Sequence, residues 1–263
     1  MPPELSELLD RAKSASGDEL KVLLHEPREE ILTAVLENPH CGETHIVLLL
    51  ERLDISPNLI EAISRQTKWN SSEAVRLRLA CHPRTPKRAA LAAVRQLYLF
   101  DLVRVSLLPS APADIKRIAE ETIISRVSHL PIGQKLTLAR RGPSRVAGAL
   151  LAEGHARAVE LALNNPFLTE SQILKVLAKQ EVPERTVAAI ARHSKWVCRQ
   201  TVRLALLRNK HTPAAVALEF LPHLSVRDLT DVSGLEDLAP HLRSYIQEEI
   251  GRRGKLQEHP GRG

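Results

Sequence analysis

The chain has 263 residues, of which 43% are hydrophobic and only 3% aromatic, and its formal net charge is +6. A core of aliphatic side chains with few aromatics favours helix-on-helix packing over a β-sandwich, so we expect an all-α fold. No apolar stretch is long enough for a signal peptide or a membrane span. The sequence therefore predicts a cytoplasmic protein without a membrane partner.

Apolar residues recur at spacings of three and four between short breaks, which predicts helices of about ten to twelve residues. We expect these helices to start near residues 43, 57, 70, 86, 99, 112, 131, 143 and 155. The odd number of helices leaves two alternatives open. Either the structural units have three helices and are armadillo-like, or the units have two helices and the segment around residues 99–107 is not a full helix.

Hydroxyl residues mark several of these helix starts. Ser56, Thr85 and Thr212 each precede a proline, which fits a hydroxyl N-cap followed by proline at the first helical position. Thr169 followed by Gln172 predicts a capping box, in which each side chain bonds a backbone N–H of the other residue.

The main feature of the sequence is an internal repeat. Residues 23–123 match residues 150–250 at a constant displacement of 127 positions without an insertion. Matched pairs include Asn38-Pro39 with Asn165-Pro166, Lys68-Trp69 with Lys195-Trp196, and Val75-Arg76-Leu77 with Val202-Arg203-Leu204. The period is about three times the ~42 residues of HEAT and armadillo units. It predicts a solenoid whose two copies superpose.

The repeat also sets the predicted domain organisation. We expect residues 1–251 to form one α-solenoid, in which helices within residues 124–149 join the two copies. Residues 252–263 hold four cationic residues and one acid, which is half of the formal net charge. Their composition predicts a disordered basic tail.

Four segments resemble the HEAT and armadillo superfamily of α-solenoids, and more narrowly a group of uncharacterised bacterial helical-repeat proteins. They are K-L-T-L-A-R-R-G from Lys135, N-P-F-L-T-E from Asn165, A-R-H-S-K-W from Ala191 and V-R-L-A-L-L-R-N-K-H-T-P from Val202. The resemblance implies a helical-repeat fold, and it implies no catalytic residues. The first copy departs from the pattern, since His40-Cys41 and Gly42 stand where the second copy has Phe167-Leu168 and Thr169.

The first candidate binding site is the basic turn around the second tryptophan, formed by Arg192, Lys195, Trp196 and Arg199. An aromatic side chain flanked by cations can stack on a nucleic-acid base while the cations hold phosphate. The alternative is structural, with the ring packed at an inter-helix corner. The related residues of the first copy, Arg65, Lys68, Trp69 and Arg76, and the second-copy Arg203 favour this structural interpretation because they recur.

A second candidate is the trio Arg140, Arg141 and Arg145 at the Gly142-Pro143 break. Three cations at one turn can bind an acidic partner or nucleic acid. The alternative is a solvated loop that gains from the macrodipole of the preceding helix. The trio does not recur in the first copy, which makes it the stronger candidate for a specific function.

Metal and disulfide chemistry are not indicated. His40, Cys41, His45, Cys81 and His82 match no zinc-site spacing, so we predict no metal. With Cys198 the cysteines number three and contain no C-x-x-C pair, so we expect reduced thiols that are mostly buried.

No nucleotide-binding, metalloprotease or hydrolase motif occurs in the chain, so we predict neither enzymatic activity nor a cofactor. The leading hypothesis is a scaffold that binds another protein through a solenoid face. The alternative is nucleic-acid binding through the basic turns and the basic tail. A third hypothesis, a lyase-type helical-repeat enzyme, rests on fold analogy alone. The sequence sets neither the partner's identity nor the oligomeric state.

Overall fold

The structure, a computed structural model, describes residues 3–234, 238 and 240–258. Within these residues every regular element is helical, and no helix is both long and apolar enough to cross a bilayer. The all-α prediction is therefore confirmed. The chain forms two compact units, residues 1–125 and residues 126–263. The predicted single solenoid over residues 1–251 would contain both units, and it stays a prediction.

The first unit contains ten helices within its described residues. They are α1 (Pro3–Ser14), α2 (Gly17–Leu23), α3 (Glu29–Glu37), α4 (Glu43–Leu49), α5 (Pro57–Arg65), α6 (Thr67–Asn70), α7 (Glu73–Cys81), α8 (Lys87–Gln96), α9 (Leu99–Leu107) and α10 (Ala113–Arg126).

The second unit has ten further α-helices and two 3-10 turns among its described residues. They are η1 (Val127–His129), α11 (Ile132–Arg141), α12 (Ser144–Glu153), α13 (Ala156–Leu163), α14 (Glu170–Leu177), α15 (Glu184–Arg192), α16 (Ser194–Val197), α17 (Gln200–Leu207), α18 (Ala214–Phe220), η2 (Leu221–His223), α19 (Val226–Ser233) and α20 (Pro240–Glu258).

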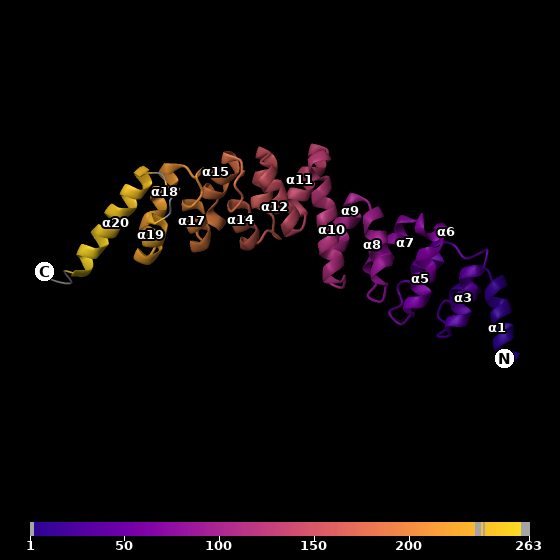
Figure 1. The fold of residues 1–263 in the computed structure, drawn as a ribbon. Helices are drawn as coiled ribbons and strands as arrows, with labels where there is room; N and C mark the ends of the chain where they lie inside the picture. The colour runs from indigo at the N-terminus through magenta and orange to yellow at the C-terminus, as the bar shows by residue number, and fades with distance from the viewer. Residues whose placement is uncertain (1–2, 235–237, 239, 259–263) are drawn as a thin grey trace. The chain divides into compact units, whose positions relative to one another are not determined.

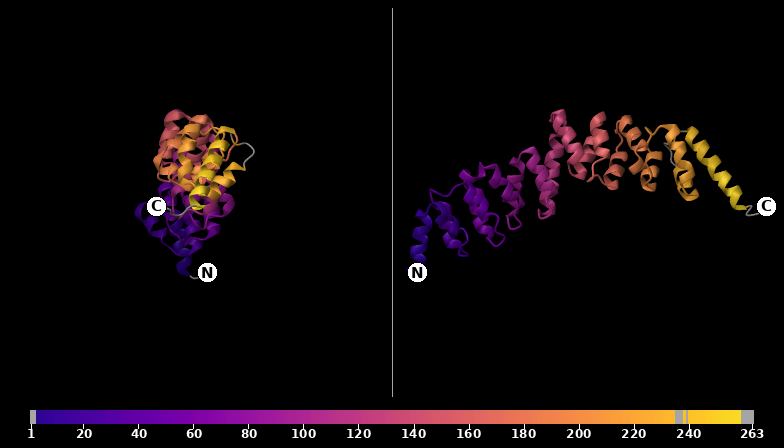
Figure 2. Two further views of the ribbon diagram at one scale, coloured as in Figure 1. Left: turned by 90° about the vertical axis from the view of Figure 1, so that its left-hand side faces the viewer. Right: turned by 180° about the vertical axis from the view of Figure 1, so that it is seen from behind.

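Helices within each unit lie side by side in chain order (Figures 1 and 2). The extensive contacts join α-helices no more than three places apart, such as α4 with α7 and α14 with α17. Most of these helices have seven to ten residues, too few to be stable alone. Each one buries an aliphatic stripe against its neighbours, as α3 does with Ile31, Leu32 and Val35. Each such side chain contributes about 1.5–3 kcal/mol when it leaves water.

The two units share details at a spacing of 127 residues. In the first unit the buried Asn38 donates from Nδ2 to the carbonyl oxygens of Ala12 (2.8 Å) and Ala15 (2.9 Å). In the second unit the buried Asn165 donates to the carbonyls of residues 139 and 142 at the same two distances. Both asparagines thus tie the turn after one helix to the end of a helix two places earlier.

The helix starts agree with the sequence predictions in some places and differ in others. The helix near residue 99 is complete, since α9 covers nine residues. The single helix predicted near residue 70 is two helices, α6 and α7. Ten helices rather than nine therefore occupy one 127-residue interval, so the odd number that raised the question of three-helix units does not arise.

The predicted N-caps are right only at Ser56, whose hydroxyl accepts from the Leu59 N–H at 3.1 Å. At Thr85 and Thr212 the helix starts one residue later than predicted, after the proline itself. Thr212 instead donates to the Leu206 carbonyl. The capping box at Thr169 is also wrong, because the Thr169 hydroxyl hydrogen-bonds Ser144 rather than its own helix.

The predicted tail at residues 252–263 needs a correction. Residues 252–258 continue α20, and residues 259–263 lie outside the described residues. Arg253 is anchored, since its guanidinium donates to the carbonyls of Leu221 and Leu224 and pairs with Glu249. Carbonyls at the C-terminal side of one helix thus hold the next one by charge-assisted bonds.

Candidate functional site

The tryptophan turn does not offer a base-stacking surface. Trp69 and Trp196 are both 2% exposed, and the Lys68 and Lys195 ammonium groups lie over the two rings at 4.3 and 4.4 Å from the centroids. The Trp196 Nε1 donates to the Leu163 carbonyl at 2.9 Å. Burial corrects the proposed stacking role of Trp196 and leaves Lys195 as the cover of its ring.

The other cations of this turn have separate positions. Arg199 is exposed and pairs with Glu170 at 3.1 Å. Arg203 donates to the Val197 carbonyl, as Arg76 does to Asn70 in the first unit. Arg192 is exposed on α15 and has no hydrogen bond or ion pair within the described part of the chain. The predicted cluster is therefore split between structural roles and one cation available to a partner.

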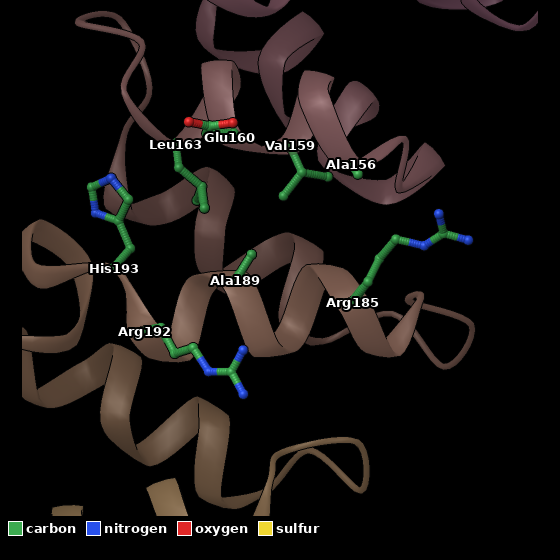
Figure 3. A pocket seen from close by; sticks show the side chains of 8 residues that line it. All are labelled: Ala156, Val159, Glu160, Leu163, Arg185, Ala189, Arg192 and His193. Atoms are coloured by element: carbon green, nitrogen blue, oxygen red, sulfur yellow. The ribbon is translucent and has the colours of Figure 1, made fainter.

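Arg192 lines a shallow pocket of about 280 Å³ between α13 and α15. Val159 and Leu163 point from α13 toward Ala189 of α15, and Arg185 and His193 lie at the ends (Figure 3). The His193 Nε2 meets Asn164 at 3.3 Å. Burial, and then the nearby Lys195 charge, lower the pKa of His193 below its ordinary 6.5, so its ring is neutral at pH 7.

The arginine trio at the Gly142-Pro143 break lies partly open to solvent. Arg140 and Arg141 are exposed in the last turn of α11, and neither makes an ion pair or side-chain hydrogen bond with any described residue. Arg145 is half-buried in the first turn of α12. Arg140 and Arg141 are therefore available to an anionic partner, although no pocket among those found includes them.

A larger hollow, which the sequence did not point to, lies between α14 and α17. This α14–α17 groove has a volume of about 990 Å³ and is lined by Leu174, Leu177, Ala178, Lys179, Gln180, Glu181, Thr201, Leu204, Ala205, Arg208, Asn209, Lys210 and His211. Its floor is aliphatic. Its cations Lys179, Arg208 and Lys210 are exposed, and no described residue pairs with them.

Contacts at both ends show that the two helices of this groove run parallel. Glu170 and Arg199 form an ion pair where α14 and α17 start, and the Asn209 Nδ2 donates to the Leu177 carbonyl at 2.9 Å where they end. The three unpaired cations therefore gather at one end of the groove, beside the helix C-termini. Helix macrodipoles place negative potential there, which favours cations.

The first unit has a groove between α4 and α7, of about 800 Å³, but its charges are engaged within the chain. Arg78 pairs with Glu51 at 2.6 Å, and Arg104 pairs with Asp101 at 3.1 Å. Cys81 lines this groove where Arg208 lines the other one. The two grooves thus share their position between helices and differ in the charge they present to solvent.

The histidine and cysteine residues singled out in the sequence have mostly structural contacts. His45 accepts from the Gly42 N–H at 3.0 Å, and both ring nitrogens of His82 contact the backbone, at Arg52 and Arg84. Searching the described residues for three or more His, Cys, Asp or Glu side chains placed to hold a metal ion finds none.

The three cysteines are free, but only Cys41 is buried, while Cys81 is half-buried and Cys198 is exposed. The prediction that most of the thiols are buried is therefore wrong. Burial raises the pKa of the Cys41 thiol to about 11, against a smaller opposing effect of the Lys68 charge.

The sequence signal for the groove cations was present but weak. Lys179, Arg208 and Lys210 follow the ends of predicted amphipathic helices, where cations are common and commonly bind terminal carbonyls. Only the structure shows that these three make no such bond. Comparisons of the chain with protein-family models, curated proteins and solved structures give no match.

Proposed function

We propose that this protein is a non-enzymatic helical-repeat scaffold that binds another protein. The observation behind the proposal is a pair of open grooves at equivalent places in the two units, with similar aliphatic floors and different charged rims. Repeat architectures keep their core constant while surface residues between neighbouring helices diverge to fit partners. This pattern favours recognition of a macromolecule over chemistry at one enclosed site.

The proposal includes a HEAT- or armadillo-like solenoid built by a 127-residue duplication. Its support is the order of helices, in which α1 to α10 correspond one by one to α11 to α20. For example, α5 and α15 are displaced by 127 residues at both ends. The matched hydrogen bonds of Asn38 and Asn165 support the same conclusion. In this proposal each copy covers a whole unit, and it is longer than the copies predicted from sequence.

Nucleic-acid binding remains the second candidate, through Arg140, Arg141 and Arg192. Phosphate recognition needs exposed cations, and these three guanidinium groups satisfy that requirement. The burial of both tryptophans removes the stacking component that single-strand binding commonly uses. The protein-binding proposal therefore has the better support.

Site-specific photo-crosslinking in cells that express the chain tests the scaffold proposal. A photoreactive amino acid replaces Ala178 in the α14–α17 groove or Ala74 in the α4–α7 groove, and the exposed Arg157 outside both grooves serves as the control position. We expect a discrete protein adduct from at least one groove position, resistant to nuclease and absent from the Arg157 control. Adducts that nuclease removes, or no groove-specific protein adduct, would refute the proposal.

A further inference from the structure

We propose that the α14–α17 groove binds an acidic amphipathic helix of the partner protein. This inference rests on the proposed scaffold function and names the chemistry of what one groove takes. Three independent properties of the groove support it: the pattern of its floor, the unpaired cations at one end, and the contrast with the equivalent groove of the first unit.

The floor has the form that accepts a third helix. Residues spaced three and four apart line it from both sides, namely Leu174, Leu177 and Ala178 from α14 and Thr201, Leu204 and Ala205 from α17. Two parallel helices that present such rows leave a furrow between them, into which the ridge of another helix packs. An aliphatic furrow of this kind selects a helix with apolar residues at positions i, i+3, i+4 and i+7.

The charge of the groove selects an acidic helix. Lys179, Arg208 and Lys210 are exposed and without ion pairs among the described residues, and His211 lies beside them. Glu181 is the single acid among the residues that line the groove. Carboxylates on the visiting helix would therefore meet cations that no group of this chain already neutralises, which adds specificity and speeds association.

These cations are not part of the architecture that the units share. At 127 residues before them, the first unit has Arg52, Cys81 and Pro83. Arg52 is fully engaged, since it donates to the Leu24 and Glu26 carbonyls and pairs with Asp54 at 2.8 Å. The fold therefore forms at this place without free cations. We infer that their presence in the second unit serves a partner rather than the packing.

The groove is less suited to nucleic acid. Single-stranded nucleic acids are held by aromatic side chains on which bases stack, together with cations along the backbone. The residues that line this groove include no Phe, Tyr or Trp. Its cations also gather at one end of the groove and do not follow its length, whereas an apolar floor contributes to peptide binding.

Fluorescence polarisation on the full chain tests the inference. The probe is a fluorescein-labelled peptide of about 18 residues, five helical turns, with Leu at i, i+3, i+4 and i+7 and mainly Glu elsewhere. A scrambled peptide of identical composition destroys the apolar stripe. The test variant carries Lys179→Glu, Arg208→Glu and Lys210→Glu. Its matched control carries three reversals at exposed, unpaired positions outside the groove, Arg140→Glu, Arg141→Glu and Arg157→Glu.

We expect saturable binding of the patterned peptide that weakens with salt. Scrambling the peptide or reversing the groove cations should each weaken binding at least about tenfold, while the control variant binds within about twofold, since charges far from a contact add little. The reversed groove should in turn bind a peptide with Lys in place of Glu. Circular dichroism confirms that each variant is folded. A triple Gln variant at the same positions should fall between wild type and reversal.

Several results would overturn this inference. Equal loss in the control variant would assign binding to the arginines around the Gly142-Pro143 break, and equal binding of the scrambled peptide would reduce it to net charge. Competition by a single-stranded DNA of similar length at equal strength would favour nucleic acid. If photo-crosslinking gives a protein adduct only at Ala74, the scaffold function stands and the inference about the α14–α17 groove fails.

Discussion

Trp69 and Trp196 occupy equivalent turns and are equally buried, yet only Trp196 has a hydrogen-bond partner for its indole nitrogen. The Trp196 Nε1 donates to the Leu163 carbonyl, whereas the buried Nε1 of Trp69 has no partner among the described residues. Both rings have an ammonium group over one face at nearly the same distance. Packing is thus matched between the two sites, and the hydrogen bond is the difference.

This difference predicts unequal effects of the same substitution. Trp196→Phe removes a buried donor and leaves the Leu163 carbonyl without it, which should cost about 1–2 kcal/mol more than the loss of ring area. Trp69→Phe removes a donor that is already unsatisfied, so only the change in ring size should matter. Urea unfolding followed by circular dichroism measures both variants. Equal shifts of the unfolding midpoint would show that the two indoles have the same hydrogen bonding in solution.

Gly154 should be intolerant of any side chain. It ends α12 in the left-handed conformation with φ of 78°, and a Cβ there would lie 2.5 Å from Cγ of Pro183. Gly154→Ala should therefore destabilise the chain by at least about 1–2 kcal/mol, from backbone strain alone.

Gly133 is the matched control for that substitution. It lies in α11, and nothing is within 4 Å of the position that a Cβ would take. Gly133→Ala should be neutral or stabilise the chain by up to about 1 kcal/mol, because alanine favours helix. Thermal unfolding of the two variants side by side measures this contrast, and a destabilised Gly133→Ala would contradict the described path of α11.

The sequence predicted the helical class and most helix positions because short amphipathic helices have a regular apolar period. It could not place the copies fully. The segment from Pro3 to Leu23 aligns with residues 130–150, but few identities remain there. Packing preserved only the small buried residues, such as Ala12 and Ala139. Helix order, not identity, reveals the correspondence of α1 with α11.

The candidate site was harder to predict than the fold. Trp196 and its cations attracted attention as a cluster in sequence, but their burial follows from contacts with α13, a helix more than thirty residues earlier. The α14–α17 groove combines residues about thirty positions apart, and its cations are unusual only because carbonyls and carboxylates do not engage them. Neither property is visible in a local stretch of sequence.

The thiols should react with an alkylating agent in the order of their exposure. Cys198 is exposed, while Cys41 is buried and its pKa is raised to about 11. At pH 8 only about one Cys41 thiol in a thousand would be thiolate, the form that attacks iodoacetamide. Mass spectrometry of timed samples should show Cys198 modified first and Cys41 last.

Unfolding in urea provides the control for this order, because it removes both burial and the raised pKa. All three thiols should then react at similar rates. Rapid modification of Cys41 in the native chain would contradict the packing described for the turn between α3 and α4. Raising the pH should accelerate the native reaction of Cys41 steadily up to about pH 11, since the thiolate fraction grows until the pKa is reached.

The neighbouring residues Arg252 and Arg253 distinguish an ordered end of α20 from a disordered basic tail. Arg253 is 22% exposed at its side chain, donates to the carbonyls of Leu221 and Leu224, and pairs with Glu249. Arg252 is 66% exposed and pairs with Glu249 alone. Arg253→Ala should leave two carbonyls without their charged donor and loosen α20 from η2, at a cost of about 1.5–3 kcal/mol. Arg252→Ala should change stability by less than about 0.5 kcal/mol, as exposed ion pairs do.

Hydrogen-exchange mass spectrometry over residues 242–254 provides the measurement, because it reports local opening rather than global unfolding. In the wild-type chain we expect protection through this segment. Protection should fall in Arg253→Ala and stay unchanged in Arg252→Ala, a substitution that removes the same charge one position away. Fast exchange of the whole segment in the wild type would instead support the disordered tail that composition predicts. Equal loss in both variants would mean that charge rather than the carbonyl contacts holds the helix.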